Sequence, residues 1–467
     1  MTASTAMPAS IRKRDDGDSH LVRRLFELRS LLIAAAILHV CVTVAVFMVG
    51  KYELFPSQFS PNGIGRFAGD GEVYQLQVAD LNKILKSEGI RRWATWPTQL
   101  HVRLYSLPLA IVSRWSSFNI LIIEPLNLFY YLAILFFVFK ITQALFDFRT
   151  AFIAATIVAL WPSFLLHTTQ LLRDPLLILA FVVLIWCWVE LILRNFSWQR
   201  LLVMTTGTII SLVTIRIVRL PMWNVMLFAL AVSIILFVVQ SVLQRRLRKE
   251  AIAYAVLAIA SVLIIPMFQP YFHNQQELGA GGNRRFIENE QEQLRPVDEQ
   301  IYRRREAFQY TVDREGRPVT MNDGSRIDPD VRLDSVGAII RQVPRALEVG
   351  LFAPFPNMWL HAGRQVGLSG RVIAGFETLL TYVIESLALF GLWARRRNLA
   401  AWLLAAVIGV GAVALGLVVS NIGAMYRLRY PFWVLMVILC AGGIRFLVTS
   451  FKFSKSIDVN SSREVSS

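Results

Sequence analysis

The feature that most constrains this chain is a series of about ten apolar segments, each close to the roughly 20 residues that a helix needs to cross a bilayer. Inside the hydrocarbon a spanning backbone must satisfy its own hydrogen bonds, and separate apolar segments of this length do so as α-helices. The sequence therefore predicts an all-α polytopic membrane protein with about ten transmembrane helices. The predicted spans lie at about 30–50, 120–145, 151–170, 175–194, 201–218, 222–244, 251–269, 372–393, 399–419 and 431–449.

The composition agrees with a membrane protein. Apolar residues make up 55% of the chain and charged residues only 17%, against about 25% charged residues in soluble domains. The net charge of +16 could indicate binding to nucleic acid, but the basic residues are spread between apolar segments and form no patch. We therefore predict no nucleic-acid partner. Cys41, Cys187 and Cys440 all lie in apolar segments, so no disulfide framework is expected.

The distribution of basic residues predicts the orientation, because Lys and Arg concentrate in cytoplasmic segments. We expect a plasma (inner) membrane protein whose N-terminal tail (1–29) and C-terminal tail (450–467) are cytoplasmic and whose active face is outward. The basic clusters that indicate this are Arg12, Lys13, Arg14, Arg23, Arg24 and Arg29; Arg245, Arg246, Arg248 and Lys249; Arg395 to Arg397; and Lys452 and Lys455.

The same orientation divides the chain into membrane modules and outer segments. An N-terminal membrane module (30–269) contains an outer loop (51–118), and the C-terminal membrane helices (372–449) follow an arginine-rich periplasmic or extracellular insertion (270–371). Within the outer loop, the apolar stretch 99–116 would make the number of crossings odd if it spanned the membrane. We expect this stretch to form interfacial or re-entrant helices. The alternative is that it crosses and another segment does not.

Ionisable residues cluster at the predicted outer face, and such residues at membrane depth are costly and often functional. The planar guanidinium of arginine matches phosphate oxygens, while a carboxylate can deprotonate a hydroxyl nucleophile. The sequence therefore predicts an enzyme that acts on a lipid phosphate or pyrophosphate. The clustered residues are Asp70 and Glu72 in the outer loop, Arg173 and Asp174 before the fourth span, Arg216 and Arg219 after the fifth, and Arg427 and Arg429 before the tenth.

Each of these groups also has a structural interpretation when it is taken alone. The Arg-Asp-Pro sequence at 173–175 can cap a helix, arginines at span ends can extend towards head groups, and Gly-Asp-Gly at 69–71 is a common turn. We interpret His39 and His167, which lie within spans, as packed residues, because no second ligand lies at metal spacing. The functional interpretation is favoured because groups from distant segments converge on one face.

Several short motifs occur in an order that resembles the GT-C superfamily of multi-pass glycosyltransferases, among them the protein mannosyltransferase and aminoarabinose transferase types that use dolichyl- or undecaprenyl-phosphate sugars. The resemblance covers about residues 60–430. The motifs are the Gly-Asp turn followed by Tyr74; Glu124-Pro125-Leu126-Asn127; Leu145-Phe146-Asp147-Phe148-Arg149; Trp161-Pro162-Ser163; Leu172-Arg173-Asp174-Pro175; an arginine after a Gly/Thr-rich span; and Tyr426-Arg427-Leu428-Arg429-Tyr430-Pro431.

This resemblance implies an inverting enzyme that moves a sugar from a polyprenyl-phosphate donor to a hydroxyl of a lipid or glycan acceptor. Asp70 matches the first-loop carboxylate that activates the acceptor. Glu72 is the substitute, because the usual acidic pair is split here as Asp-Gly-Glu. Arg427 and Arg429 match the late arginine stretch near the donor phosphate.

The other charged residues of the outer face are given supporting roles. We assign Arg173, Arg216 and Arg219 to the donor phosphate, and Tyr74 and Asp174 to the acceptor or to positioning. The predicted chemistry requires no cofactor. A divalent cation is compatible with two carboxylates two residues apart, but the sequence requires none and we assign no metal ligand.

Two other functions are compatible with the same residues. A polymerase or ligase of lipid-linked surface polysaccharide would also place outer-face arginines on a pyrophosphate. The pairs Arg305–Gly316 and Arg326–Gly337 fit a spacing described for such polymerases. A non-catalytic lipid or solute carrier would need charges along a path through the bilayer, whereas the ionisable residues of the predicted spans lie mostly near their ends.

Overall fold

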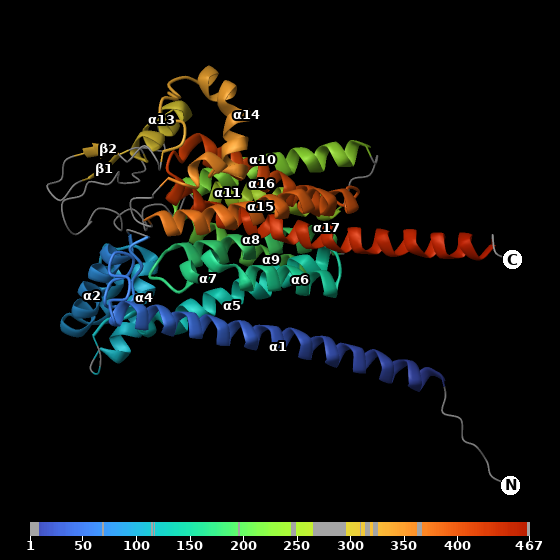
Figure 1. Cartoon of the computed structure of the whole chain (residues 1–467), viewed down its shortest axis with the longest axis horizontal. Helices are drawn as coiled ribbons and strands as arrows, with labels where there is room; N and C mark the ends of the chain where they lie inside the picture. Colours follow the sequence, from blue (N-terminus) through green and yellow to red (C-terminus); the bar gives the residue numbers. More distant parts are fainter. Residues whose placement is uncertain are drawn as a thin grey trace, which may run out of the picture.

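The protein is almost entirely helical in the computed structural model, which describes residues 9–67, 70–113, 115, 117–194, 197–243, 249–264, 296–308, 310–312, 318–320, 326–361 and 367–464. The predicted all-α fold class is thereby confirmed. The long helices run side by side along the longest axis of the molecule. The helices α2 (Asp70–Ser87) and α4 (Leu100–Val112) and a small hairpin lie at one end, and the start of the first helix and the end of the last helix lie at the other (Figure 1).

The helices and strands have the following bounds. The first half of the chain contains α1 (Ala9–Lys51), α2 (Asp70–Ser87), α3 (Gly89–Thr95), α4 (Leu100–Val112), α5 (Ile120–Leu145), α6 (Phe148–Leu160), α7 (Pro162–Thr168), α8 (Asp174–Leu193), α9 (Trp198–Val218) and α10 (Leu220–Leu243). The second half contains α11 (Lys249–Ile264), α13 (Val297–Ala307), β1 (Tyr310–Val312), β2 (Pro318–Thr320), α14 (Val336–Phe352), η4 (Pro356–Met358), α15 (Gly367–Ala394), α16 (Leu399–Val418) and α17 (Ile422–Glu464). Strands β1 and β2 pair antiparallel, with Thr311 opposite Val319.

Among the described residues, seven helices are long and apolar enough to cross a membrane, or eight if a bent pair counts as one span. The predicted number of about ten is therefore not confirmed. Predicted span 222–244 contributes the shorter apolar helix Leu220–Leu236, and in span 251–269 the helix is described only to Ile264. The seven helices are Phe26–Lys51, Ile120–Leu145, Asp174–Leu193, Trp198–Val218, Gly370–Ala394, Leu399–Val418 and Ile422–Ser450.

The predicted span 151–170 is broken into two helices. Helix α6 ends at Leu160, α7 begins at Pro162, and the two helices are bent by 67° at this break. Proline has no amide hydrogen and disfavours helical backbone in the residue before it. Trp161 accordingly has φ −71° and ψ 115°. The hydropathy of the segment hides this bend, although Pro162 marks it.

The outer loop contains short helices. Helix α4 has 13 residues, which correspond to about 20 Å and fall short of the roughly 30 Å hydrocarbon core. Helix α2 buries Tyr74 and Val78 but leaves Leu76 largely exposed. These lengths and exposed apolar side chains agree with an interfacial position, which stays a prediction.

Small residues allow close helix crossings in the C-terminal half, as is common between membrane helices. A Cβ added to Gly391 of α15 would lie 1.8 Å from the Leu439 carbonyl oxygen of α17. One added to Gly443 of α17 would lie 1.9 Å from the Leu387 carbonyl oxygen of α15. Any larger residue at either position would force α15 and α17 apart.

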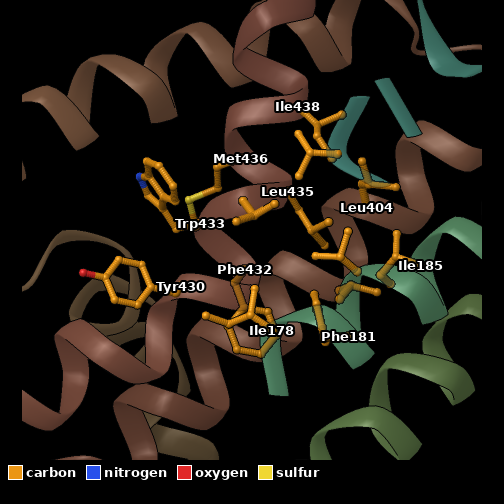
Figure 2. Packing of buried hydrophobic residues seen from close by; sticks show 14 of the residues in the cluster. Ile178, Phe181, Ile185, Leu404, Tyr430, Phe432, Trp433, Leu435, Met436 and Ile438 are labelled. Carbon is orange, nitrogen blue, oxygen red and sulfur yellow. The ribbon is translucent and has the colours of Figure 1, made fainter. Parts of the chain in front are cut away.

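Aromatic packing connects α17 to α8 in the centre of the bundle. Phe181 and Phe432 meet edge to face with ring centroids 5.4 Å apart, within the apolar cluster drawn in Figure 2. This contact holds the N-terminal halves of α8 and α17 close together. Each half carries a charged residue that the sequence assigns to the site, Asp174 in α8 and Arg427 in α17.

The described part of the predicted insertion packs against the C-terminal end of α16. Arg305 is 4% exposed and its guanidinium donates hydrogen bonds to the carbonyl oxygens of Gly416, Leu417, Ile327 and Asp328. Helix α14 approaches α16 so closely that a Cβ on Gly416 would lie 1.9 Å from the Ala346 carbonyl oxygen. Residues 270–295 of the predicted insertion lie outside the described residues, as does Gly316 of the polymerase-like spacing.

Candidate functional site

The structure joins three segments of the predicted site through one arginine. The Arg427 Nη2 atom donates a hydrogen bond to the Asp70 Oδ2 atom at 3.1 Å, and its Nη1 atom lies 3.8 Å from the Asp174 Oδ2 atom. Arg219 completes the network, with its Nη1 atom 3.7 Å from the Asp174 Oδ1 atom. The side chains of Asp70 and Arg427 are each 18% exposed. Four residues that are distant in sequence thus form one partly buried ion-pair network.

Both carboxylates of this network stand at the start of a helix. Asp70 is in the first turn of α2 and Asp174 in the first turn of α8, where Pro175 also favours the helix start. The positive end of each helix dipole stabilises a carboxylate there. The helix-start interpretation of Arg-Asp-Pro at 173–175 is therefore confirmed, whereas Asp70 and Gly71 belong to α2 and not to a turn. The ion pairs with Arg427 come in addition.

A hydrogen-bond network on α5 and α4 fixes the turn that leads into Asp174. The Asn127 side chain donates to the Gln170 carbonyl oxygen at 3.2 Å. Tyr105 donates to the Asn127 side chain at 2.6 Å and lies 3.2 Å from the Leu172 carbonyl oxygen. The Gln170 side chain in turn accepts a hydrogen bond from the Gly65 amide at 2.7 Å. One side chain therefore connects the segment before Asp70 to the segment before Asp174.

Tyr74 lies beside the network but cannot act as a base. Burial, together with the charge of Asp70, raises the pKa of Tyr74 to about 12, although the charge of Arg173 opposes this shift. Its ring meets the His101 ring edge to face, with centroids 4.5 Å apart. The Tyr74 hydroxyl stays protonated at neutral pH and can donate a hydrogen bond. The assignment of Tyr74 to the acceptor or to positioning stays a prediction.

His101 is a buried histidine beside the site that the sequence did not single out. It is 0% exposed, and neither ring nitrogen has a hydrogen-bond partner among the described residues. Burial lowers the pKa of His101 to about 3, and the charge of Arg173 lowers it further. The ring is therefore neutral, and it packs against the ring of Tyr74.

The alternative base, Glu72, lies in a different environment. Its Oε1 atom is 3.3 Å from the Arg66 Nε atom, and the two side chains are 55% and 47% exposed. Solvent screens an exposed ion pair of this kind, so it contributes little to the stability of the folded protein. Asp70 and not Glu72 is thus the first-loop carboxylate that contacts Arg427.

The remaining arginines that the sequence assigns to the donor phosphate have different surroundings in the structure. Arg429 is 4% exposed, and its Nη1 atom donates to the carbonyl oxygens of Leu351 at 2.6 Å and Ala353 at 2.9 Å. Arg216 is buried with its guanidinium carbon 5.3 Å from the centroid of the Trp223 ring. Arg173 is the N-cap residue of α8, and its charge acts on both Tyr74 and Arg427.

Two clusters of buried polar side chains lie within the helical bundle. The sequence did not indicate that the members of either cluster contact one another. In the first, the Glu124 carboxylate contacts His39 Nδ1 at 2.8 Å and accepts a hydrogen bond from Thr43 at 2.7 Å. His39 is therefore packed, as predicted, with Glu124 as its partner.

The second cluster connects α7, α15 and α17. Tyr430 donates to the Ser163 side chain at 2.8 Å, while the Ser163 amide donates to the Glu377 carboxylate at 2.8 Å. His167 belongs to the same cluster through Ser163 and Tyr430. A signal was present in the sequence, because an intramembrane glutamate such as Glu377 normally has a polar partner.

No group of three or more His, Cys, Asp or Glu side chains within the described ranges is arranged to hold a metal ion. The divalent cation that the sequence left open stays a proposal without assigned ligands.

No protein-family model matches the chain, and the comparison with curated proteins finds no match. Solved structures of an archaeal oligosaccharyltransferase are similar to the chain at low identity, and the chain spans about half of their length. One is the apo form from Archaeoglobus fulgidus, with 12% identity and a TM-score of 0.45 over 92% of this chain and 52% of that one. The other is AglB from Archaeoglobus fulgidus in complex with an inhibitory peptide and a dolichol-phosphate, with 12% identity and a TM-score of 0.45 over 93% of this chain and 52% of that one.

Proposed function

We propose that this protein is a membrane glycosyltransferase that moves a sugar from a polyprenyl-phosphate donor to a hydroxyl of a lipid or glycan acceptor at the outer face of the membrane. The observation that supports this most directly is the contact between Asp70 and Arg427. A carboxylate that can take a proton and a guanidinium that can bind a phosphate lie side by side in this contact. The order of the sequence motifs points to the same chemistry.

In the proposed reaction the acceptor oxygen attacks C1 of the sugar, and the bond between C1 and the phosphate oxygen breaks. The bonding electrons leave with the polyprenyl phosphate, and Asp70 takes the acceptor proton. A single displacement of this kind inverts the configuration at C1. Arg427 stabilises the negative charge that develops on the leaving phosphate.

The ion pair between Asp70 and Arg427 sets the order in which the donor binds and the acceptor is activated. While Arg427 donates to Asp70, the carboxylate is a weaker base, because an adjacent cation favours its ionised form. A donor phosphate that binds Arg427 replaces Asp70 as its partner. The carboxylate is then released to take a proton from the acceptor. Donor binding therefore precedes acceptor activation.

Mass analysis of membrane lipids from a deletion strain tests the proposed function. We expect a polyprenyl-phosphate sugar to accumulate and an acceptor to lack that sugar. Wild-type protein should restore the acceptor, whereas Asp70→Asn and Arg427→Ala should not, although both insert into the membrane. Glu72→Gln is the matched control and should restore it. An unchanged lipid profile in the deletion strain would refute the function.

A further inference from the structure

The ring of His167 is held in one tautomer by its own helix. Its Nδ1 atom lies 2.6 Å from the Ser163 carbonyl oxygen, one turn earlier in α7. A carbonyl oxygen can only accept a hydrogen bond, so the proton must be on Nδ1. In the neutral imidazole, Nε2 then carries a lone pair and can only accept.

The Nδ1 side of the ring is fully occupied by the second polar cluster. Besides the Ser163 carbonyl oxygen, the Tyr430 hydroxyl lies 3.3 Å from Nδ1. That hydroxyl donates a hydrogen bond to the Ser163 side chain. Nε2 has no hydrogen-bond partner within the described residues, and it is not among the fully buried atoms that lack one. The His167 side chain is only partly buried, so Nε2 is its remaining acceptor.

Two aromatic rings flank His167. Its centroid lies 5.2 Å from that of Phe67 and 5.5 Å from that of Tyr430, with interplanar angles of 70° and 62°. Phe67 comes shortly before Asp70 in the outer loop, and Tyr430 lies about one helical turn after Arg427. In Figure 2 the hydroxyl of Tyr430 points away from the apolar cluster around Phe432.

The same ring lies close to the ion-pair network. The charges of both Arg427 and Asp174 act on His167. A phosphate on Arg427 would therefore bring the sugar attached to it into the neighbourhood of His167. Aromatic walls with a few placed polar groups are the usual means of orienting a bound small molecule.

We propose that His167 and the ring of Phe67 bind the sugar of the lipid-linked donor, with Nε2 accepting a hydrogen bond from a sugar hydroxyl. Tyr430, which is 3% exposed, supports the His167 ring from the other side. This inference rests on the proposed function and deepens it. It separates recognition of the sugar at His167 from recognition of the phosphate at Arg427 and from proton removal at Asp70.

Two substitutions separate this role from a purely structural one. Asn at position 167 places an amide nitrogen near the position of Nδ1, so it keeps the bond to the Ser163 carbonyl oxygen and removes the acceptor at Nε2. Gln extends further and can place an amide oxygen near the position of Nε2. A sugar-binding role therefore predicts that His167→Gln is tolerated better than His167→Asn. A role in fixing α7 predicts the reverse.

The test uses the full protein in nanodiscs, titrated with undecaprenyl phosphate and with its mannosyl, glucosyl and aminoarabinosyl esters. We expect the wild type to bind one ester more tightly than the bare lipid phosphate. His167→Asn should lose about tenfold in affinity for that ester, as expected for one lost hydrogen bond of about 1.4 kcal/mol. His167→Gln should retain most of the preference, and both variants should bind the bare lipid phosphate like the wild type.

A third variant, Phe67→Leu, leaves every hydrogen bond of His167 in place and should also weaken the preference for the ester. Thermal unfolding without lipid checks that all three variants are folded. The inference is overturned if no ester is preferred, if His167→Asn keeps the preference, if His167→Gln loses as much as His167→Asn, or if Phe67→Leu is without effect. Failure of the wild type to bind even bare undecaprenyl phosphate would instead refute the proposed function.

Discussion

Arg429 donates a hydrogen bond from Nη1 to the Leu351 carbonyl oxygen at 2.6 Å, and so connects α17 to the last turn of α14. Arg427, only two residues earlier, contacts Asp70 instead. Residues two apart on a helix point about 200° away from each other. The two arginines, which look equivalent in sequence, therefore have different surroundings and should respond differently to substitution.

Arg427→Ala should abolish transfer and leave the protein inserted and folded, because the phosphate loses its guanidinium. Arg427→Lys should recover only part of the activity, since an ammonium cannot form the bidentate fork. Transfer rates in nanodiscs and thermal unfolding of both variants measure the two effects. Wild-type turnover in Arg427→Ala would remove this residue from the proposed mechanism.

Arg429→Ala should act mainly on stability. The substitution leaves the carbonyl oxygens of Leu351 and Ala353 without their charged donor, and a hydrogen bond to a charged group contributes about 1.5–3 kcal/mol. We expect a lower unfolding temperature than for Arg427→Ala, together with faster proteolysis of α14. If Arg429→Ala unfolds like the wild type but no longer binds lipid phosphate, the sequence-based assignment of Arg429 to the donor is the better one.

Asp70→Asn keeps the shape of the side chain but cannot accept the acceptor proton. We expect turnover to fall by about 10²-fold or more, the usual effect of removing a general base. Donor affinity should not fall and should rise, because the phosphate no longer competes with a carboxylate for Arg427. Glu72→Gln, at an exposed position two residues away, is the matched control and should retain activity. A dead Glu72→Gln beside an active Asp70→Asn would move the base to Glu72.

Gln170→Ala should impair transfer without altering any charged residue. The substitution removes the acceptor for the Gly65 amide, and the loop before Asp70 is then no longer fixed to the turn before Asp174. We expect turnover to fall by about tenfold or more, because small errors in placing reactive groups are costly. Thr214→Ala, whose side chain bonds the Ile210 carbonyl oxygen of its own helix α9, is the control. Equal turnover in both variants would show that Gln170 has no positioning role.

Labelling of single cysteines tests the orientation. In a chain with Cys41→Ala, Cys187→Ala and Cys440→Ala, an impermeant thiol reagent applied from outside should label Asp330→Cys and not Arg396→Cys. Both positions are exposed, so the membrane alone should decide which one reacts. The reverse pattern would place the ion-pair network on the cytoplasmic side.

The sequence was sufficient to predict the helical class and to bring Asp70, Asp174 and Arg427 to one face. Hydropathy places span ends, and functional charges collect at those ends. It could not separate Asp70 from Glu72 or Arg427 from Arg429, because that separation depends on the rotation of a helix about its axis. The sequence indicates a packed role for His167 because no second ligand lies at metal spacing, and it does not reveal the contact with Tyr430, which is 263 positions away.

The break at Pro162 could have been predicted, because a proline after an aromatic residue stands in the middle of the apolar segment. A sliding hydropathy window averages over such a residue and reports one continuous span. The packing of α14 against α16 is harder to foresee. It depends on small residues, Ala346 and Gly416, whose significance appears only when the two helices are placed together.

The ion-pair network of Asp70, Asp174, Arg219 and Arg427 contains two cations and two anions. Its formal charges cancel, so these four groups exert little long-range attraction on the abundant anionic lipids of the surrounding leaflet. A lipid phosphate must instead compete at contact distance with a carboxylate for the same guanidinium. Ordinary head groups would therefore bind weakly at this network. Only a ligand that makes further contacts with the protein would displace Asp70 from Arg427.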